Sequence, residues 1–412
     1  MRFTSAISGE VDPAAAVDDI GDRVLNGLGG LPCHFITLFV SSIYQTDWAP
    51  LMARLQEKVQ PEVLIGCSAS GIIGAEQELE WVPAVSAVAA NLPGVKLYPF
   101  MVNADELERA EAGGFWIDKV GAAPGDQPVF VLFVDPYTCE PRKLLGEINE
   151  TYRERPVVGG LASGGQGPGE QHLILGGSIV REGAIGVAMT GNITMDTIVS
   201  QGCRPIGRPY VVTQAEENLI VKLAGRPAVA ALHEALASLS SEDRELAQQG
   251  AVFAGLVVDE MRPKFGAGDF LIRNIIGIDP ASGALAVGDE VPVGKTLQFH
   301  LRDAATSRDE LRRLLQQHGH LHQFSPPAGA LFFNCLGRGR SLYGVSNHDV
   351  RTIRTMRGKF PIGGFFCNGE IGPLGSTNFL HGYTASIGLF RPGQLSAPSS
   401  GRTPPGLEPD AS

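Results

Sequence analysis

Three short apolar runs recur along the chain, and each has the pattern of a buried strand. They are "HFITLFV" at 34–40, "VFVLFV" at 129–134 and "ALFFNCL" at 330–336. Continuous runs of Val, Ile, Leu and Phe of this length are typical of strands that are covered on both faces. The pattern therefore predicts three interior strands that are spread over the whole chain.

A glycine motif follows each run at a similar distance. The first motif glycine comes 27, 26 and 31 residues after Phe39, Phe133 and Phe333, respectively. A match this short can occur by chance in a chain with 52 glycines, so the flanking segments decide whether the copies are related. The three motifs, which fit G-x-x-[AC]-[SN]-G, are "GCSASG" at 66–71, "GGLASG" at 159–164 and "GFFCNG" at 364–369.

The flanking segments repeat as well. Each gap between run and motif contains a helix candidate, and each motif is followed by a strand of small residues at 84–92, 184–191 or 384–390. The helix candidates are 47–59 with Asp47 as N-cap, 141–154 with Pro141 in its first turn, and 347–358 with Asn347 as N-cap and Gly358 past its end.

The repeated unit is thus a strand, a helix, a second strand that ends in the glycine motif, and then hairpin strands. Such units predict a strand-rich α/β protein of the mixed α+β kind, with sheets flanked by helices. The segment 251–303 leaves two interpretations open. It is a fourth, degraded copy in which "GIDPASG" echoes the motif, or "DPASG" is a plain hairpin turn.

We expect two domains, 1–198 with two copies of the unit and 199–392 with the third. The second begins with a Pro- and Gly-rich connector, followed by a hairpin of "YVVTQAE" with "LIVKLAG" and a helix at 227–239. The tail 393–412 lacks apolar residues that could anchor it, so we expect it to be disordered.

Composition and charge narrow the function classes. The 412 residues carry a net charge of −11 and no run of Lys and Arg, which argues against a nucleic-acid partner. No apolar run approaches the ~18 residues that span a bilayer. The six cysteines are scattered without a C-x-x-C, which is typical of reduced thiols, so we expect a cytoplasmic protein.

The ends of the motif strands are the candidate binding site. Glycine leaves backbone N–H groups accessible there, and a neighbouring hydroxyl or amide adds a grip for a carboxylate, phosphate or carbonyl group. Asp135 and Arg338 follow buried strands, where ligand contacts are frequent. The candidate residues are Gly66, Cys67, Ser68, Ser70, Asp135, Gly159, Gly160, Ser163, Arg338, Gly364, Cys367, Asn368, Glu370 and His381.

Other interpretations of these residues stay open. The glycines can serve turns and close strand packing, and Asp135 or Arg338 can form a surface salt bridge. Cys367 with His381 is the composition of a nucleophilic pair, but no G-x-S-x-G elbow is present, so we favour binding over catalysis. "HGHLH" at 318–322 is either a metal-ligand set or, as we expect, a solvated helix end.

Longer blocks resemble the FIST domain family, in both its N-terminal and its C-terminal part. They include "GCSASGIIG", "VVGGLASGG", "CLGRGRSLYG" and "FPIGGFFCNGEIGPLGSTNFLHGYTASIGLF", and the resemblance spans about 30–392. The last block is the most specific of these. The resemblance implies a ligand-sensing module for small molecules such as amino acids.

The resemblance also implies an output partner and an alternative cofactor. Members of this family occur attached to signalling domains, which this chain lacks, so a separate signalling protein would carry its output. Some members bind haem in nitric-oxide signalling, in which case His381 or His233 would be the axial ligand. We expect no cofactor and no metal, and Asn368 and Glu370 as contacts to an amino-acid-like ligand.

Overall fold

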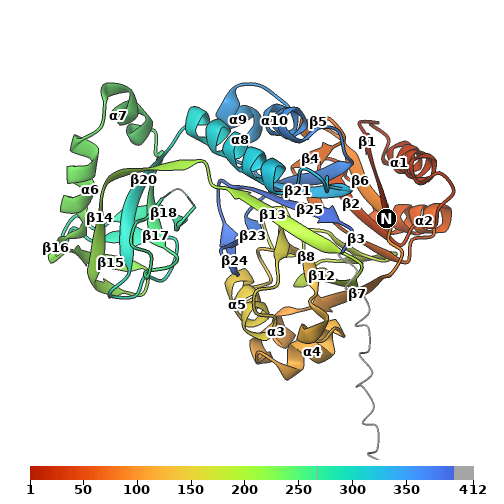
Figure 1. Cartoon of the computed structure of the whole chain (residues 1–412), viewed down its shortest axis with the longest axis horizontal. Coiled ribbons are helices and arrows are strands. Elements are labelled where there is room, and N and C mark those ends of the chain that lie inside the picture. Colours follow the sequence, from red (N-terminus) through yellow and green to blue (C-terminus); the bar gives the residue numbers. More distant parts are fainter. Residues whose placement is uncertain (267, 394–412) are drawn as a thin grey trace, which may run out of the picture.

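The computed structural model describes residues 1–266 and 268–393. The disordered tail that we expect at 393–412 lies, beyond Gly393, outside the described residues. The fold is mixed α+β, as predicted, and consists of a larger body of three units and a smaller β-module. Figure 1 shows the β-module at one end of the larger body.

Three units of the predicted kind make up the larger body. Unit 1 consists of β2 (Phe35–Ser41), α2 (Trp48–Val59), β3 (Val63–Ala69), β4 (Gly71–Gly74), β5 (Gln77–Glu80) and β6 (Val85–Asn91). Unit 2 consists of β8 (Val129–Val134), α5 (Pro141–Thr151), β9 (Val157–Leu161), β10 (Leu173–Leu175), β11 (Ser178–Val180) and β12 (Ala184–Gly191). Unit 3 consists of β21 (Gly329–Cys335), α10 (His348–Arg357), β22 (Ile362–Cys367), β23 (Glu370–Leu374), β24 (Thr377–His381) and β25 (Ala385–Arg391).

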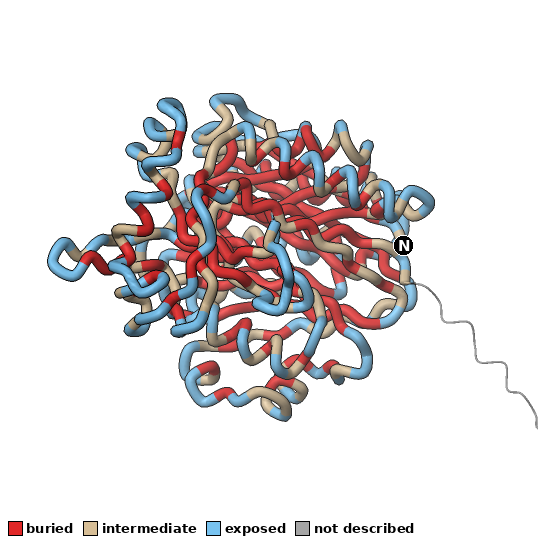
Figure 2. Tube along the Cα trace, turned by 60° about the vertical axis from the view of Figure 1, so that its left-hand side comes forward, coloured by how far each residue is buried: buried red, intermediate tan, exposed pale blue. Residues whose placement is uncertain are grey.

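Further strands and helices complete each unit. The strands β1 (Arg2–Ser8), β7 (Val95–Val102) and β13 (Thr194–Ser200) pair with β6, β12 and β25. Helices cover the outer faces of the sheets, and the strands between them are buried (Figures 1 and 2). The additional helices are α1 (Pro13–Leu28), α3 (Ala104–Arg109), α4 (Gly114–Val120), η1 (Pro124–Asp126), α8 (Ala304–Leu321) and α9 (Gly339–Tyr343).

The three sheets exchange their hairpins in a cycle. Their strand orders are β1-β6-β2-β3-β10-β11, β7-β12-β8-β9-β23-β24 and β13-β25-β21-β22-β4-β5. The hairpin of unit 2 therefore extends the sheet of unit 1, that of unit 3 extends unit 2, and that of unit 1 extends unit 3. The predicted ranges 1–198 and 199–392 consequently share two sheets.

The first motif glycines lie at equivalent places, as predicted. Gly66, Gly159 and Gly364 face Leu38, Leu132 and Phe332 across the parallel strand pairs. A Cβ atom at these glycines would lie 2.0, 1.8 and 1.7 Å from the carbonyl oxygens of those partners. Real Cβ atoms do not come this close to backbone, so each position requires the approach that glycine permits.

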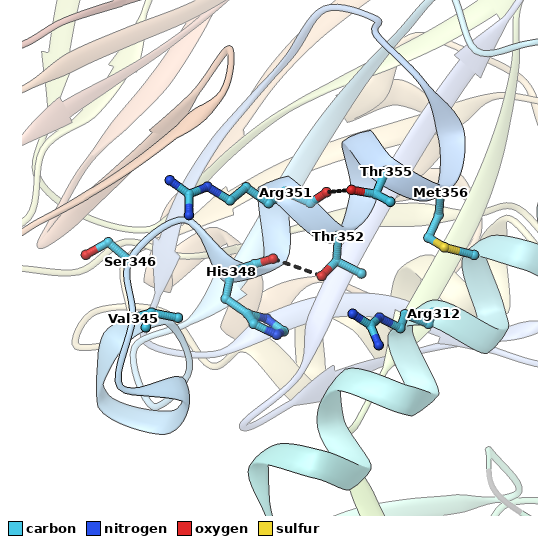
Figure 3. A pocket seen from close by; sticks show the side chains of 8 residues that line it. All are labelled: Arg312, Val345, Ser346, His348, Arg351, Thr352, Thr355 and Met356. Carbon is cyan, nitrogen blue, oxygen red and sulfur yellow. Dashed lines mark hydrogen bonds between the residues drawn. The ribbon is translucent and has the colours of Figure 1, made fainter.

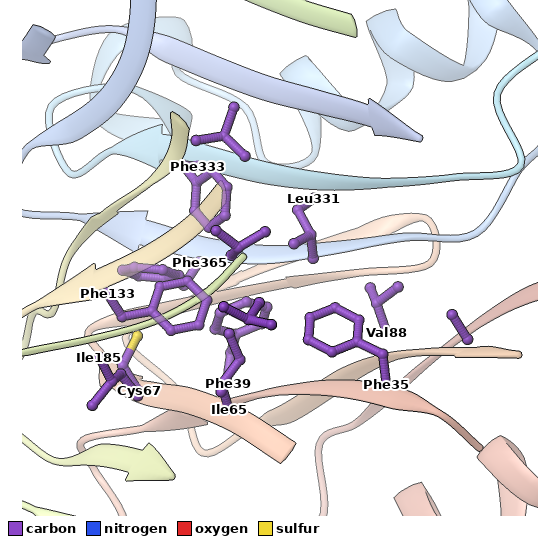
Figure 4. Packing of buried hydrophobic residues seen from close by; sticks show 14 of the residues in the cluster. Phe35, Phe39, Ile65, Cys67, Val88, Phe133, Ile185, Leu331, Phe333 and Phe365 are labelled. Carbon is purple, nitrogen blue, oxygen red and sulfur yellow. The ribbon is translucent and has the colours of Figure 1, made fainter. Parts of the chain in front are cut away.

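The interior between the sheets is aromatic, and it repeats the threefold pattern. Phe39, Phe133 and Phe333 occupy the same place in β2, β8 and β21, and their ring centroids lie 5.5 to 6.5 Å apart. Figure 4 shows the three rings together with Phe365, which contacts all of them. Edge-to-face packing of this kind adds to the stabilisation from burial.

All three predicted helix starts are confirmed. Asp47 caps α2 through the N–H of Ala49, and Pro141 occupies the first turn of α5. Asn347 is the N-cap residue of α10, but its side chain makes no cap bond and instead accepts from the N–H of Glu78 at 2.6 Å. Asn347 thus ties unit 3 to the exchanged hairpin of unit 1.

The β-module is a small barrel between β13 and α8. Its strand order is β14-β20-β17-β18-β19-β15-β16, and a β14–β15 pairing closes it. All its described pairings are antiparallel, so "DPASG" is the plain hairpin turn and the fourth copy is not formed. Its elements are β14 (Cys203–Glu216), β15 (Leu219–Leu223), β16 (Arg226–Pro227), α6 (Ala228–Ala237), α7 (Ser241–Gln248), β17 (Val252–Val257), β18 (Phe270–Ile278), β19 (Leu285–Val287) and β20 (Thr296–Arg302).

Among the described residues, no helix has the length and apolar character needed to cross a membrane.

Candidate ligand-binding site

The ends of the three motif strands meet in one place, which we call the junction: Ser70, Ser163 and Asn368. The Ser163 hydroxyl accepts from the Ser70 N–H at 3.0 Å and donates to the Phe366 carbonyl at 2.6 Å. The Asn368 N–H donates to the Leu161 carbonyl at 3.1 Å. The three copies of the [SN] position are therefore brought together by the fold, at the carboxyl edge of the parallel strand pairs, where ligands bind in many open α/β sheets.

A narrow crevice opens beside the junction, between units 1 and 3. It is lined by Ser70, Gly71, Glu80, Trp81, Leu336 and Phe366. The crevice has no room for a water-sized sphere, so a ligand can enter only when one of its walls moves.

Trp81 is the exposed wall of the crevice. Its side chain is 66% exposed, whereas Trp48 and Trp116 are buried. Its backbone has a φ of 58°, in the left-handed region, and its N–H donates to the Ser70 carbonyl at 3.2 Å. A bulky residue in this region costs about 1–3 kcal/mol, and such strain gathers at ligand clamps and switch regions.

Glu80 supplies a carboxylate next to this ring. Burial raises its pKa, and the backbone N–H of Arg340, at 3.0 and 3.3 Å from the two carboxylate oxygens, opposes that rise. Each oxygen retains capacity to accept a further hydrogen bond. The Arg340 side chain is exposed, so a cation and an anion lie at the same mouth.

Behind the crevice lies a buried ion pair. The Arg338 Nε donates to Asp349 at 2.9 Å, and both side chains have no exposed surface. Burial by itself raises the pKa of the Asp349 carboxyl, but the Arg338 guanidinium holds it well below its usual range. Arg338 therefore does not form the surface salt bridge that the sequence left open.

Two buried carboxyls flank this pair. Burial raises the pKa of Glu78 and of Glu370 to about 8, because it disfavours the charged form of both carboxyls. One polar atom of each of these carboxyls has no hydrogen-bond partner among the described residues, and the same holds for Asn334 Oδ1 and Arg338 Nη1. Unsatisfied buried polar groups and shifted pKa values are typical of functional sites.

The other predicted site residues lie in the strands and turns around the junction. The Ser68 hydroxyl accepts from the His172 N–H, and Asp135 accepts from Tyr137 and Thr138 of its own turn. Cys67 and Cys367 are fully buried, and burial raises the pKa of both thiols well above the usual value. Gly160 packs directly against Cys367, and Glu370 accepts from the Thr384 N–H at 2.9 Å.

His381 lies opposite Glu370 across the β23–β24 hairpin. Its Nε2 is 2.9 Å from the Gly372 carbonyl, and burial lowers its pKa to about 4. The Cys367 thiol donates to Phe365, not to His381. A thiol whose pKa is raised and an imidazole whose pKa is lowered oppose the ion pair that activates a cysteine nucleophile.

Of the two histidines named for haem, His381 does not fit that group. An axial ligand needs a free ring nitrogen that faces a cavity able to hold the macrocycle. His381 is enclosed in the sheet and its Nε2 is engaged. His233 is exposed on α6, where it lines an open hollow of about 430 Å³.

The expectation of a solvated helix end at "HGHLH" is wrong for His318. This residue lies within α8, is buried, and has its Nε2 3.0 Å from Asp196 of β13. His322 lies near the same carboxylate, which gives three groups at metal-ligand spacing. Arg391 donates to both oxygens of Asp196, at 2.6 and 2.7 Å, and so already neutralises the carboxylate.

Family models match most of the chain. The FIST N domain model matches residues 34–226, and the FIST C domain model matches residues 228–373. The chain belongs to the FIST family. FIST domains are associated with signal transduction and with the sensing of small ligands.

Curated relatives extend over nearly the full chain. An uncharacterized protein of Mycobacterium tuberculosis (strain H37Rv) is 38% identical over 396 residues, which is 95% of this chain and 100% of the relative. An uncharacterized protein of Mycobacterium bovis is 35% identical over 394 residues, at 95% and 99% coverage. A solved cyanuric acid hydrolase of A. caulinodans aligns over 95% of this FIST chain at 9% identity with a TM-score of 0.31, which supports no conclusion.

Sequence reasoning missed Glu80, Trp81 and Asp349. Glu80 and Trp81 lie in "ELEWVP", a polar stretch after the first motif, and only the hairpin exchange carries it to the unit 3 sheet. Asp349 lies on the buried face of α10, together with Val350, Thr352 and Ile353. The signal that could have revealed Asp349 is an acidic residue at a position where the helix pattern predicts burial.

Proposed function

We propose that this FIST protein is a small-ligand receptor in signal transduction, and that its ligand is an amino acid or a related amine that enters the crevice. The observation that carries the proposal is Trp81, an exposed aromatic ring in a strained backbone conformation next to the Glu80 carboxylate. An aromatic face beside a carboxylate favours an ammonium group. The exposed guanidinium of Arg340 is suited to the carboxylate of the same ligand.

The closed crevice supports a sensing role. A ligand that binds only when Trp81 has moved favours the open conformation by its differential affinity for that state. Arg340, whose N–H holds Glu80, lies two residues from buried Arg338, so opening the crevice would disturb the loop that carries the buried ion pair. No signalling domain accompanies the site in the described residues, so we propose that a separate protein reads this change.

We also propose a cytoplasmic compartment. All six cysteines are free thiols, which is typical of a reducing environment.

Trp81 provides the test. Because the other two tryptophans are buried, acrylamide quenching of the native protein reports mainly on Trp81. We expect L-lysine, L-alanine or γ-aminobutyrate to change the emission and its quenching in a saturable manner, whereas acetate does not. The Trp81→Phe variant should lose this signal.

Charge variants separate a specific site from a surface effect. Glu80→Gln removes the charge but keeps an oxygen for the Arg340 N–H, and it should weaken binding by roughly 30- to 1000-fold, or ~2–4 kcal/mol. Glu76→Gln is the matched control, since Glu76 lies in the same hairpin and makes only an exposed ion pair with Lys359. Equal affinity of the two variants, or no response to any amine, would reject the proposal.

A further inference from the structure

A second hollow, which we call the α8/α10 groove, lies on the outer surface of unit 3. Arg312 of α8 forms one side, His348, Arg351 and Thr352 of α10 form the other, and Val345 and Ser346 close one end. Its volume is about 210 Å³, the space of about seven water molecules at about 30 Å³ each. The groove therefore suits a compact ligand.

The groove is cationic. In Figure 3 the Arg312 side chain extends from α8 toward the His348 ring, and the Arg351 guanidinium points toward Ser346. Neither arginine has an ion-pair partner in the part of the chain that the structure describes, and no Asp or Glu lies among the described residues that line the groove. Both side chains are exposed, and they give the groove a local positive charge on a chain of net charge −11.

The floor of the groove is rigid. The His348 ring stacks on Tyr343 with centroids 3.5 Å apart, and its Nδ1 lies 3.0 Å from Asp349. Since the Asp349 carboxylate can only accept, Nδ1 carries the proton and the ring is fixed in one orientation. The Thr352 hydroxyl donates to the His348 carbonyl, which holds this turn of α10 in place.

The N-terminus of α10 adds to the positive potential. The helix runs from His348 to Arg357, and Asn347 leaves its first turn without a side-chain cap bond. Helix N-termini favour anions, and here this effect acts beside the two arginines, not alone.

We propose that the α8/α10 groove binds a small phosphomonoester. Guanidinium forks match the oxygens of phosphate, and a phosphomonoester carries close to two negative charges at pH 7. The small volume fits a phosphate group with a few further atoms. The site is separate from the crevice and does not depend on the amine ligand proposed above.

Calorimetric titration of the full chain with glycerol 3-phosphate and with inorganic phosphate, at constant ionic strength, tests this inference. We expect saturable binding of both, and at least tenfold weaker binding to Arg312→Gln and to Arg351→Gln. Arg313→Gln is the matched control, because Arg313 is the exposed neighbour in α8 and its guanidinium bonds Gln317. Ser346→Asp keeps both arginines but places a carboxylate at the groove, and it should also abolish binding.

Binding that is equal in wild type and in all four variants, or no binding of either anion, would overturn the proposal. Glu80→Gln should leave the phosphate titration unchanged, and Arg312→Gln should leave the Trp81 response to amines unchanged. The two proposals can therefore be rejected independently of each other.

Discussion

Arg338 and Asp349 form an ion pair that is closed off from solvent on all sides, with the Nε and Oδ2 atoms 2.9 Å apart. Burying two charges is costly, and the cost is recovered only while both partners are present. The Tyr343 hydroxyl accepts a further hydrogen bond from Arg338 at 2.7 Å, which satisfies part of the guanidinium.

Breaking this pair from one side should destabilise the protein strongly. We expect Asp349→Asn to lower the free energy of unfolding by about 3–5 kcal/mol, because it leaves the Arg338 charge buried and uncompensated. Urea unfolding measures this. The double variant Arg338→Met with Asp349→Leu should lose less free energy of unfolding than the sum of the losses in the single variants Arg338→Met and Asp349→Leu. Arg23→Gln, at an exposed pair with Asp19, is the control and should cost under about 1 kcal/mol. Additive losses would show that the two groups do not interact.

The motif glycine of unit 3 should be intolerant of a side chain. A Cβ at Gly364 would lie 1.7 Å from the Phe332 carbonyl oxygen, so Gly364→Ala must displace a strand and should cost at least about 3 kcal/mol. Gly146 in α5 has nothing within 4 Å of its would-be Cβ, and Gly146→Ala should instead stabilise by about 0.5–1 kcal/mol. Thermal unfolding of the two variants checks this, and similar shifts in both would refute the packing role.

Glu370 should make stability depend on pH. Burial raises its pKa in the folded protein to about 8, above the ordinary value near 4.5, so the folded state binds the proton more tightly than the unfolded state. The protonated Glu370 side chain contributes fully to the free energy of unfolding below about pH 4.5. This contribution is lost as the pH rises toward 8, by at most about 1.4 kcal/mol per pH unit.

We therefore expect Glu370→Gln to flatten the loss of stability between pH 5 and 8, because glutamine cannot ionise. Urea unfolding at several pH values gives the two curves. Glu10→Gln is a control at an exposed carboxyl. If wild type and Glu370→Gln lose stability in parallel, Glu370 is ionised in the folded protein.

The cysteines should be unreactive in the native state. Five of them are buried and Cys335 is partly buried, and burial raises the pKa of the Cys335 thiol to about 12. Because the thiolate is the reactive form, an aromatic disulfide reagent at pH 8 should label the folded protein slowly and all six thiols quickly in urea. Rapid labelling of Cys367 in the native protein would revive the nucleophile interpretation.

The repeated unit was predictable because its signals are local. Apolar runs, caps such as Asp47 and the spacing to Gly66, Gly159 and Gly364 are short-range features, and the structure confirms them. The hairpin exchange was not predictable, since a short hairpin carries no mark of the sheet that it joins. Trp81 and Glu80 became visible as a site only through that exchange.

Polar residues far apart in the chain posed the same difficulty. Asn347 has the sequence context of a cap, yet its partner is Glu78 in another unit. His318 reads as a surface histidine, yet Asp196 meets it from a strand more than a hundred residues earlier. Side-chain pairs of this kind depend on tertiary packing. The spacing of apolar residues predicts helices and strands, but it does not predict which of them pack against each other.

The cyclic hairpin exchange constrains the order in which the protein can be completed on the ribosome. The sheet of unit 1 has all its strands once β11 has been made, at Val180. The edge of β9 stays unpaired until β23 has been made, at Leu374. The hairpin β4–β5 stays unpaired until β22 has been made, at Cys367. Nascent chains therefore carry an unpaired strand edge for most of synthesis, and exposed edges template aggregation. Premature termination in the last unit should yield insoluble fragments, not a smaller folded protein.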